Sequence, residues 1–393
     1  MAAFARKLWP DSSSGLTHMA AARQLTDAPT VAEALCLQAT QALAQGSGKG
    51  IGVLVINYNT ACQTLRCLAS IQQSTLLPDW VLVLDNASSP SDYQHLLQGA
   101  QPPRGGSLRI YRSDQNLGFA QGSNVLIDLL LKQPACQHIM LLNNDAVAEK
   151  DMLATLSAAL EAAGSGAGLA GGRMHKLADP AEVDTLGIAM YASLMPADRK
   201  SLDDTFIGPT GGCCMLTRAL IEQLKAVSGY CFDPRFFCYC EDTDMVLRAV
   251  LLGYRPIYLD QLVALHEGQA SSGGGYNPFI AYHGLRNTLW MHVKLMPAGM
   301  LWRYGLFLLL AHVLMMARHT LAGRFSLMWR VYRDAIRRLP EFISERKRLR
   351  PHVQSQYTAL PRYVTPRFYR EGYARLVVQE HSVFKNFFFG SKK

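Results

Sequence analysis

The sequence lacks the patterns that identify several common kinds of site. Its nine cysteines are an odd number and include no Cys-x-x-Cys pair, which argues against a zinc ribbon or a disulfide framework and favours reduced thiols. It has no H-E-x-x-H, G-x-S-x-G or Walker A pattern, so these metalloprotease, serine hydrolase and P-loop motifs are excluded. Residues 1–15, MAAFARKLWPDSSSG, turn polar early and predict no secretory signal peptide.

Charged residues are few and unevenly distributed. They make up 18% of the 393 residues, against 49% apolar residues, which predicts one large domain with appendages and a sizeable core. The net charge is +9, and eleven Lys or Arg against three acids lie between Trp302 and Arg350. Such an excess is compatible with nucleic acid, an anionic membrane or a phosphorylated substrate. No RRM, zinc-finger or helix-turn-helix signature accompanies it, so no nucleic-acid partner is expected.

Four short apolar runs alternate with helical patterns. This alternation predicts a parallel sheet covered by helices on both faces. A dinucleotide-binding domain would carry G-x-G-x-x-G after the first strand, but this chain has NYNTAC there, with no glycine. The dehydrogenase interpretation is therefore weak. The predicted strands are residues 51–59, 80–88, 107–114 and 138–145.

Each predicted strand ends in residues rich in Asn or Asp. The four ends read NYN, DNAS, RSDQN and NND. In open α/β sheets, ligands bind beyond the carboxyl ends of the strands. Asn and Asp are also ordinary turn residues, so a single end of this kind would indicate only a turn. Four such ends after apolar strands favour a shared binding site.

Six segments occur in the order found in one enzyme family. They read VLVINYNT, VLVLDNASS, NLGFAQGSN, LLNNDA, GYCFDPRFFCYCEDTDMVLRAVLLGY and LHEGQASSGG. In these segments the chain resembles the family 2 glycosyltransferases of the GT-A fold, most of all the branch of bacterial rhamnosyltransferases and other surface-polysaccharide transferases. The resemblance covers residues 51–290. It implies an α/β nucleotide-diphospho-sugar transferase fold with a mostly parallel sheet flanked by helices.

The resemblance places a nucleotide-sugar donor at the ends of the first strands. It implies that Asp85 accepts the N3–H of a uracil or thymine base, with an Asx turn as the structural alternative. Gly118 and Gly122 would let the backbone approach the ligand, and the helix that follows would favour the diphosphate with its N-terminus. The implied donor-binding residues are Asn57, Tyr58, Asn59, Asp85, Asn86, Ser88, Asn116, Gly118, Asn124 and Asn144.

The resemblance also implies a divalent cation, Mg²⁺ or Mn²⁺, after the fourth strand. Hard cations prefer oxygen ligands, and a cation here would offset the charge of a departing nucleoside diphosphate. The family's Asp-x-Asp element is altered, because Asn143 replaces its first carboxylate and leaves Asp145 as the anionic ligand. His266, after a later apolar strand, is the second expected ligand, although a single histidine there is usually structural. Asn143 is the third candidate.

A cluster of acids lies in residues 238–254, CYCEDTDMVLRAVLLGY. The spacing of the apolar residues predicts a helix that begins near Asp242 or Thr243 and ends at Gly253. Acids at a helix N-terminus are ordinary capping groups, so the position alone does not require catalysis. The resemblance implies that Asp242 is the base that takes a proton from the acceptor hydroxyl. Glu241 and Asp244 would orient this base or bind the acceptor.

Two further segments are expected near the acceptor. Residues 208–218, GPTGGCCMLTR, resemble the family's glycine-containing acceptor segment. The resemblance therefore implies that the chain passes close beneath the sugars at Gly211 and Gly212. Arg286 either reaches a phosphate or lies on an ordinary surface helix, and the sequence favours neither.

The C-terminal third predicts contact with a membrane surface. Residues 305–317, GLFLLLAHVLMMA, are fewer than the roughly twenty that a spanning helix needs. Residues 324–350 have a basic amphipathic pattern that suits an anionic inner leaflet, and a charged helix packed on the catalytic domain is the alternative. The aromatic, basic tail at residues 383–393 is another candidate for contact with a membrane or a partner. The predicted parts are a flexible or weakly helical extension (1–48), the catalytic domain (49–290) and a helical, basic region (291–393).

The predicted function is an inverting, metal-dependent transfer of a sugar in polysaccharide biosynthesis. The donor would be a nucleoside-diphosphate sugar, dTDP-rhamnose or a UDP-sugar, and the acceptor a glycan or a lipid-linked glycan. We expect the protein in the cytoplasm, peripheral to the cytoplasmic face of the inner membrane. The alternative is a catalytically silent, membrane-attached scaffold, which Asn143 favours and the intact Glu-Asp-Thr-Asp sequence opposes. The oligomeric state is not indicated.

Overall fold

The computed structural model describes residue 48, residues 50–268 and residues 276–371. All of these belong to the second of the chain's two units, residues 43–393, and the first unit is residues 1–42. Apart from Gly48, the expected N-terminal extension lies outside the described residues, as do the end of the LHEGQASSGG segment and the aromatic tail.

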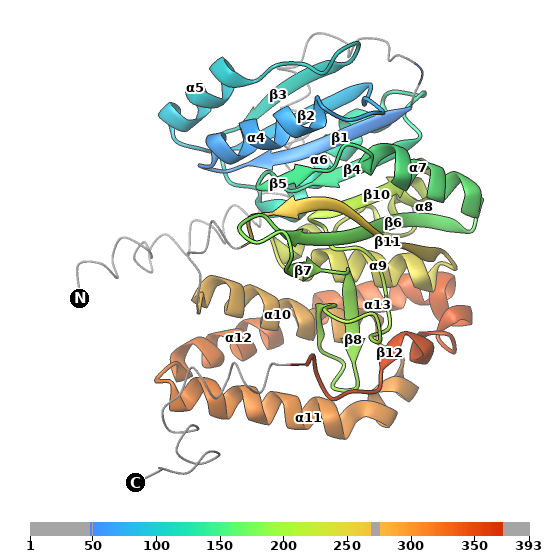
Figure 1. The fold of residues 1–393 in the computed structure, drawn as a ribbon. Helices are drawn as coiled ribbons and strands as arrows, with labels where there is room; N and C mark the ends of the chain where they lie inside the picture. The colour runs from blue at the N-terminus through green and yellow to red at the C-terminus, as the bar shows by residue number, and fades with distance from the viewer. Residues whose placement is uncertain (1–47, 49, 269–275, 372–393) are drawn as a thin grey trace. The chain divides into compact units, whose positions relative to one another are not determined.

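Within the described residues, the first half of a nine-stranded sheet is parallel (Figure 1). Strand β1 pairs with β2 and with β4, and β2 pairs with β3. Strands β1, β2 and β4 are short apolar runs buried on both faces, as helices on each side of a parallel sheet require. The four predicted strands and the helices between them are confirmed. They are β1 Ile51–Asn57, α4 Ala61–Ile71, β2 Trp80–Asn86, α5 Pro90–Gly99, β3 Ser107–Ser113, α6 Gly118–Leu131 and β4 His138–Leu142.

Beyond β4 the sheet is mixed, so the expected mostly parallel arrangement holds for its first half. Strand β10 lies antiparallel between β4 and β6, and β11 runs parallel to β6 and antiparallel to β5. The path of the sheet is β3-β2-β1-β4-β10-β6-β11-β5, with β7 paired to β6. These elements are β5 Ala146–Ala148, α7 Met152–Ala163, β6 Ala167–Lys176, β7 Val183–Thr185, β10 Cys213–Thr217, α8 Arg218–Ser228, α9 Glu241–Leu251 and β11 Arg255–His266.

The strand register brings the predicted polar ends together. Asn57 at the end of β1 lies opposite Asp85 at the end of β2, and Asp85 lies opposite Arg112 of β3. Strand β4 ends at Leu142, directly before Asn143. Because parallel strands in register end at the same edge of a sheet, the polar residues of three strands meet there.

Helix α6 packs on one face of the sheet through a glycine. A Cβ atom on Gly122 would lie 3.0 Å from Ile56 Cδ1 and 3.1 Å from Leu84 Cδ2, which are side chains of β1 and β2. Gly122 therefore allows close approach of helix and sheet, whereas the sequence led us to expect close approach of a ligand. The opposite face packs against α4 and α7 in the main hydrophobic core, which includes Cys67 and Leu156.

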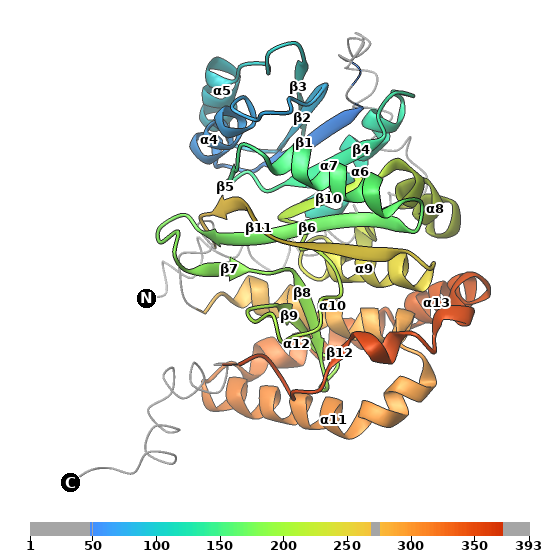
Figure 2. The ribbon, with the colours of Figure 1, turned by 45° about the vertical axis from the view of Figure 1, so that its right-hand side comes forward.

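The C-terminal helices form a group of their own beside α9 (Figure 2). Helix α10 begins before residue 290 and continues past it, so the expected domain boundary at 290–291 falls inside a helix. The apolar run at 305–317 is the middle of a 24-residue helix, α11, and is not a separate short element. A three-stranded sheet joins the end of the described chain to the catalytic region, because β12 pairs with β8. These elements are β8 Ile188–Tyr191, β9 Pro196–Asp198, α10 Pro278–Leu295, α11 Ala298–Leu321, α12 Phe325–Arg337, α13 Leu339–Val353 and β12 Val364–Thr365.

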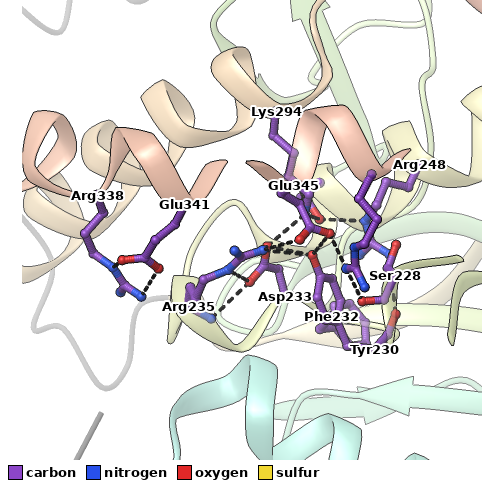
Figure 3. A network of polar contacts seen from close by, with 12 residues as sticks. Ser228, Tyr230, Phe232, Asp233, Arg235, Arg248, Lys294, Arg338, Glu341 and Glu345 are labelled. Carbon is purple, nitrogen blue, oxygen red and sulfur yellow. Dashed lines mark hydrogen bonds and ion pairs between the residues drawn. The ribbon is translucent and has the colours of Figure 1, made fainter. Parts of the chain in front are cut away.

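A buried network of charges fastens α10 to α9 and to the segment before it (Figure 3). Lys294 Nζ lies 2.8 Å from Asp233 Oδ2 and 2.8 Å from Asp244 Oδ1, and all three side chains have no exposed surface. Arg248 Nε donates to Asp244 Oδ2 at 2.8 Å. Arg235 pairs with Asp233 at 2.5 Å. The two carboxylates are therefore neutralised by three cations inside the protein, which offsets much of the cost of burying them.

We predict that Lys294→Met lowers the free energy of unfolding by about 3–5 kcal/mol, because Asp233 and Asp244 would each lose a buried partner. Denaturant unfolding followed by circular dichroism measures this loss. Lys347→Met, at an exposed position of α13, is the matched control and should change stability by no more than about 0.5 kcal/mol. Equal effects of the two substitutions would contradict a stabilising role for the network.

Candidate active site

Asp85 lies near the end of β2, at the edge of the sheet where the polar strand ends meet. Its side chain has no exposed surface, and its Oδ1 accepts a hydrogen bond from Asn57 Nδ2 at 3.0 Å. Its Oδ2 faces Arg112 Nε at 3.5 Å. The carboxylate is therefore held at the end of β2 in one orientation, and one of its oxygens keeps a long, weak contact.

Of the three predicted donor residues at the end of β1, Asn57 is buried and the two that follow it are exposed. The side-chain amide of Asn57 donates to Asp85, Ser88 and Asp92, so this residue holds the strand ends together. Tyr58 is 49% exposed, and Asn59 has a left-handed backbone with a φ of 55°. Of these three residues predicted to bind the nucleotide-sugar donor, Tyr58 and Asn59 are accessible, whereas the side-chain amide of Asn57 is hydrogen-bonded within the protein.

The connection from β3 to α6 is locked by two asparagines. Asn86 Nδ2 donates to Asn116 Oδ1 at 3.0 Å, and Asn86 Oδ1 accepts the amide of Leu117 at 2.8 Å. Gly118 has a φ of 73°, and a Cβ there would lie 2.4 Å from the carbonyl oxygen of Phe237. That carbonyl accepts the amide of Ala120 at 3.0 Å. The N-terminus of α6 therefore already binds a protein carbonyl, which reduces its capacity for a diphosphate.

Two further predicted donor residues are engaged inside the protein. Asn124 donates from Nδ2 to the Phe232 carbonyl at 2.7 Å and accepts the Phe232 amide at 2.9 Å, so both ends of its amide are used. Asn144 Nδ2 donates to the hydroxyls of Thr60 and Thr64 at the start of α4. Both side chains hold neighbouring segments in place, Asn124 with both ends of its amide and Asn144 with its donor.

Asp145 and His266 meet although they are far apart in the sequence. His266 Nε2 lies 3.1 Å from Asp145 Oδ1 and 3.4 Å from Asn143 Nδ2. This meeting follows from the pairing of β11 with β5, which sets His266 opposite Ala146. On its other side, His266 Nδ1 lies 2.8 Å from Asp184 Oδ2. The three predicted metal ligands thus lie together, and Asp184 is a fourth member that the sequence did not indicate.

The charge state of His266 follows from its two carboxylate neighbours. Burial alone would lower the pKa of the imidazole, but hydrogen bonds to Asp145 and Asp184 and their negative charges outweigh it and raise the pKa to about 10. The proton that these carboxylates stabilise on the imidazole competes with a cation, which could bind His266 only by displacing it.

The residues around His266 fit part of a divalent cation site. Asp145 and His266 would supply one oxygen and one nitrogen ligand, and Asp184 would orient the ring from its other nitrogen, as carboxylates do behind metal-bound histidines. Across residues 50–268 and 276–371, no group of three or more His, Cys, Asp or Glu side chains is arranged to hold a metal by itself. The remaining ligands would have to come from Asn143, from water or from a bound diphosphate.

Asp242 stands at the start of α9 beside the glycine segment. Its Oδ2 accepts the Gly211 amide at 3.0 Å, and its Oδ1 accepts the Thr243 amide at 2.6 Å. Burial raises the pKa of Asp242 above its usual value, and these hydrogen bonds oppose the rise. The neighbouring Glu241 is buried, and burial together with the charge of Asp242 raises its pKa well above the usual value. Burial therefore disfavours the charged form of Glu241 strongly, while Asp242 keeps hydrogen bonds that favour its charged form, and Asp242 is the candidate base.

Asp244 does not share this position. Its carboxylate has no exposed surface and pairs with Arg248 and Lys294 in the buried network. A carboxylate enclosed in this way does not bind an acceptor, contrary to what the resemblance implied. Asp242 and Asp244 lie two residues apart on one helix, so their side chains point about 200° apart around its axis.

Gly211 and Gly212 contact both Asn143 and Asp242. The Asn143 amide donates to the Gly212 carbonyl at 2.9 Å, and the Gly211 amide donates to Asp242. A Cβ on Gly212 would lie 3.1 Å from Asn143 Nδ2, and a Cβ on Gly211 would lie 3.4 Å from Asp242 Cβ. One short backbone segment therefore contacts both Asn143, a cation candidate, and Asp242, the base candidate.

The segment before Asp242 has a strained backbone that α10 holds in place. Phe237, Tyr239 and Cys240 have φ values of 67°, 66° and 69°, which are unfavourable for residues with side chains. Asn287 Nδ2 donates to the carbonyls of Phe236 at 2.9 Å, Cys238 at 2.9 Å and Tyr239 at 2.7 Å. Asn287 has no exposed surface, and it restrains the strained turn that leads into the candidate base.

Arg286 supports this arrangement and does not face solvent. Its Nε donates to Asn287 Oδ1 at 3.0 Å, and its guanidinium lies 4.2 Å from the centre of the Trp290 ring. The side chain is 8% exposed, so neither the phosphate contact nor the surface helix considered from the sequence describes it. Arg286 orients Asn287.

Two residues of the site were missed by the sequence interpretation. Asp184 is 82 residues from His266, and no local pattern marks it as a partner. Asn287 is an ordinary residue within an apolar helical pattern. Only the carboxyl–imidazole and amide–carbonyl contacts of the folded chain reveal their roles. The sequence offered one weak indication: the charged residue Arg286, next to Asn287, marks this part of α10 but does not indicate a role for Asn287.

Comparison with known proteins supports the fold class. Residues 52–225 match the model of the family described as glycosyl transferase family 2. This range contains the predicted donor residues, Asn143, Asp145 and the two glycines, and it ends before Asp242 and His266. Together with the sheet order, the match confirms the predicted α/β architecture of the GT-A class. No curated protein matches the sequence.

Solved structures show a distant likeness. TarS 1-349 of S. aureus has 14% identity and a TM-score of 0.45, covering 79% of this chain and 91% of that chain. The mannosyltransferase PcManGT of Pyrobaculum calidifontis, in complex with GDP-Man and Mn²⁺, has 16% identity and a TM-score of 0.45, covering 83% and 93%. A longer TarS structure has 17% identity and a TM-score of 0.42, covering 62% of this chain, which spans 39% of that one.

We predict that Asn287→Ala lowers the free energy of unfolding by about 1–3 kcal/mol, because buried carbonyls of the strained turn lose their donor. Urea unfolding measures the change. Gln98→Ala replaces an exposed amide side chain on α5 and should leave stability nearly unchanged. If both variants unfold at the wild-type urea concentration, Asn287 does not restrain the turn.

Proposed function

We propose that the protein is an inverting glycosyltransferase. It transfers a sugar from a nucleoside-diphosphate donor to a hydroxyl group of an acceptor. The family match over residues 52–225 supports nucleotide-sugar glycosyl transfer as the class of reaction. One observation carries the proposal: adjacent residues of one backbone segment bind both a cation candidate and the candidate base, Gly212 binding Asn143 and Gly211 binding Asp242.

The proposed reaction is a single displacement at the anomeric carbon. The Asp242 carboxylate accepts the proton of the acceptor hydroxyl while that oxygen forms a bond to the anomeric carbon. The bond from the anomeric carbon to the diphosphate oxygen breaks, and the nucleoside diphosphate leaves with that electron pair. The attack comes from the side opposite the leaving group, so the configuration inverts. Glu241 is buried beside Asp242, and we propose that it helps to orient this base.

Asp145 and His266 would hold a divalent cation, Mg²⁺ or Mn²⁺, on the donor side of this segment. Such an ion would offset the charge that develops on the departing diphosphate. Asp184 fixes the orientation of His266 through Nδ1. Asn143 replaces a carboxylate and adds no charge, so this site should bind a cation more weakly than one with two carboxylates.

The donor and the acceptor follow from the sequence resemblance. We propose dTDP-rhamnose or a UDP-sugar as the donor, with Asp85 accepting the N3–H of the pyrimidine from its place at the end of β2. The acceptor is a glycan or a lipid-linked glycan of a surface polysaccharide. Tyr58 and Asn59 are the accessible residues beside Asp85 and would contact the nucleotide.

We predict that Asp242→Asn abolishes sugar transfer while nucleotide-sugar binding survives, because the amide cannot accept the hydroxyl proton. A panel of nucleotide-sugars, assayed for donor hydrolysis and for transfer, measures activity, and calorimetry measures binding. In the wild type, the rate should rise with pH through a midpoint above the usual carboxyl pKa of 3.8, because the pKa of Asp242 is raised and only its ionised form is a base.

Asp203→Asn, at an exposed position outside the site, is the matched control and should retain wild-type turnover. Unchanged turnover in Asp242→Asn would remove the assignment of the base. Absence of hydrolysis and transfer with every nucleotide-sugar, by a protein that still binds one, would favour the silent scaffold.

We predict that Mn²⁺ and a nucleoside diphosphate together raise the melting temperature, and that Asp145→Ala loses this shared effect, because ligands that bind only the folded state stabilise it. A thermal-shift assay with each ligand alone and both together measures the coupling. Asp179→Ala, an exposed carboxylate on another loop, should behave as wild type. An undiminished shift in Asp145→Ala would exclude Asp145 as a cation ligand.

A further inference from the structure

The outward side of α11 is apolar. Trp302 is 92% exposed, Leu306 76% and Leu309 62%. A helix on the surface of a soluble protein carries polar residues on its outer side, and α11 reverses this pattern. The exposed large apolar residues recur at helical spacing and so lie along one side. They are Trp302, Leu306, Phe307, Leu309, Leu310, Val313, Leu314 and Leu321.

Helix α12 also exposes large apolar side chains. It lies between α10 and α11 (Figures 1 and 2), and His312 Nδ1 of α11 lies 2.8 Å from the Tyr332 hydroxyl of α12. Phe325, Trp329 and Ile336 of α12 are 54%, 61% and 63% exposed. We call the exposed apolar residues of the two helices the α11–α12 face.

The same two helices are strongly basic. From residue 298 to residue 338 the chain has seven arginines and one acid, Asp334. Arg303 and Arg337 are exposed next to the apolar residues. An apolar face with cationic neighbours complements a bilayer that contains anionic lipids. A second copy of the chain is a poorer partner, because pairing two such faces would bring their arginines together.

The packing of α11 favours a position along the membrane surface. By length and composition, α11 is the one helix among the described residues that could cross a membrane. Its inner side, however, is packed on the protein: Met300, Ala311 and His319 are buried, and His312 contacts Tyr332. A crossing would remove these side chains from their partners and place two histidines in lipid, where polar groups are costly.

We propose that the α11–α12 face docks the protein on an anionic lipid bilayer, with α11 lying in the plane of the interface. Trp302 and the leucines of α11 enter the boundary between headgroups and acyl chains. Arginines of both helices contact the lipid phosphates. This docking is independent of sugar transfer, so its test does not depend on the proposed enzymatic activity.

The test is co-flotation of the full-length protein with vesicles of phosphatidylcholine, with and without phosphatidylglycerol. The wild type should float with the vesicles that contain phosphatidylglycerol. Leu306→Glu/Leu310→Glu should lower the bound fraction at least about tenfold, because charged side chains are unfavourable in the interface. Leu97→Glu/Leu202→Glu makes the same change in charge at exposed leucines outside the C-terminal helices, and its binding should match the wild type.

Circular dichroism checks that the α11 variant is folded. If it is not, Arg303→Gln/Arg337→Gln should weaken the preference for phosphatidylglycerol, whereas Arg104→Gln/Arg255→Gln should not. Bound protein should be released by alkaline carbonate, as a surface-bound protein is. If the protein stays with the vesicles after carbonate, α11 does not lie in the plane of the interface. If the protein does not float but forms a dimer, and Leu306→Glu/Leu310→Glu abolishes that dimer, the face binds a second copy of the chain.

Discussion

The site depends on a short stretch of backbone that has no side chains. Gly211 and Gly212 pass between Asn143 and Asp242, and they bind one through a carbonyl and the other through an amide. Strand β10 begins at the next residue and pairs with β4, so the position of the glycines follows from the sheet itself. A Cβ on Gly212 would lie 3.1 Å from Asn143 Nδ2 and one on Gly211 3.4 Å from Asp242 Cβ, so the glycines let the backbone pass close to both residues.

The position of the candidate base, Asp242, depends on helices outside the segment that matches the family. Asn287 and Lys294, both from α10, restrain the strained turn and neutralise the buried carboxylates behind α9. A buried charge pair rarely adds much net stability, but it strongly penalises any arrangement in which a partner is missing. The network therefore fixes where α10 sits against α9. The helices that follow α10 carry the exposed apolar face, so one group of helices both supports the site and presents that face.

Much of the fold was predictable because its signals are local. Apolar runs of strand length, helical spacing and polar strand ends lie within short windows of the sequence, and all four early strands were found. The site was predicted less evenly. The resemblance brought Asp145 and His266 together correctly in space, whereas Asn57 and Asn124 bind the protein's own groups. An asparagine amide has both a donor and an acceptor, and so it suits a loop as well as a ligand.

The sequence by itself determined the order of strands and helices, the polar ends of the strands and the acidic start of α9, because each depends on neighbouring residues. Only the tertiary structure decided where the side chain of each acid lies. Asp242 and Asp244 have the same chemistry and nearly the same position in the sequence, but the turn of the helix directs one toward Gly211 and the other into a buried pair with Lys294. The two carboxylates differ because their partners come from elements distant in the sequence, and the residues around each acid do not indicate those partners.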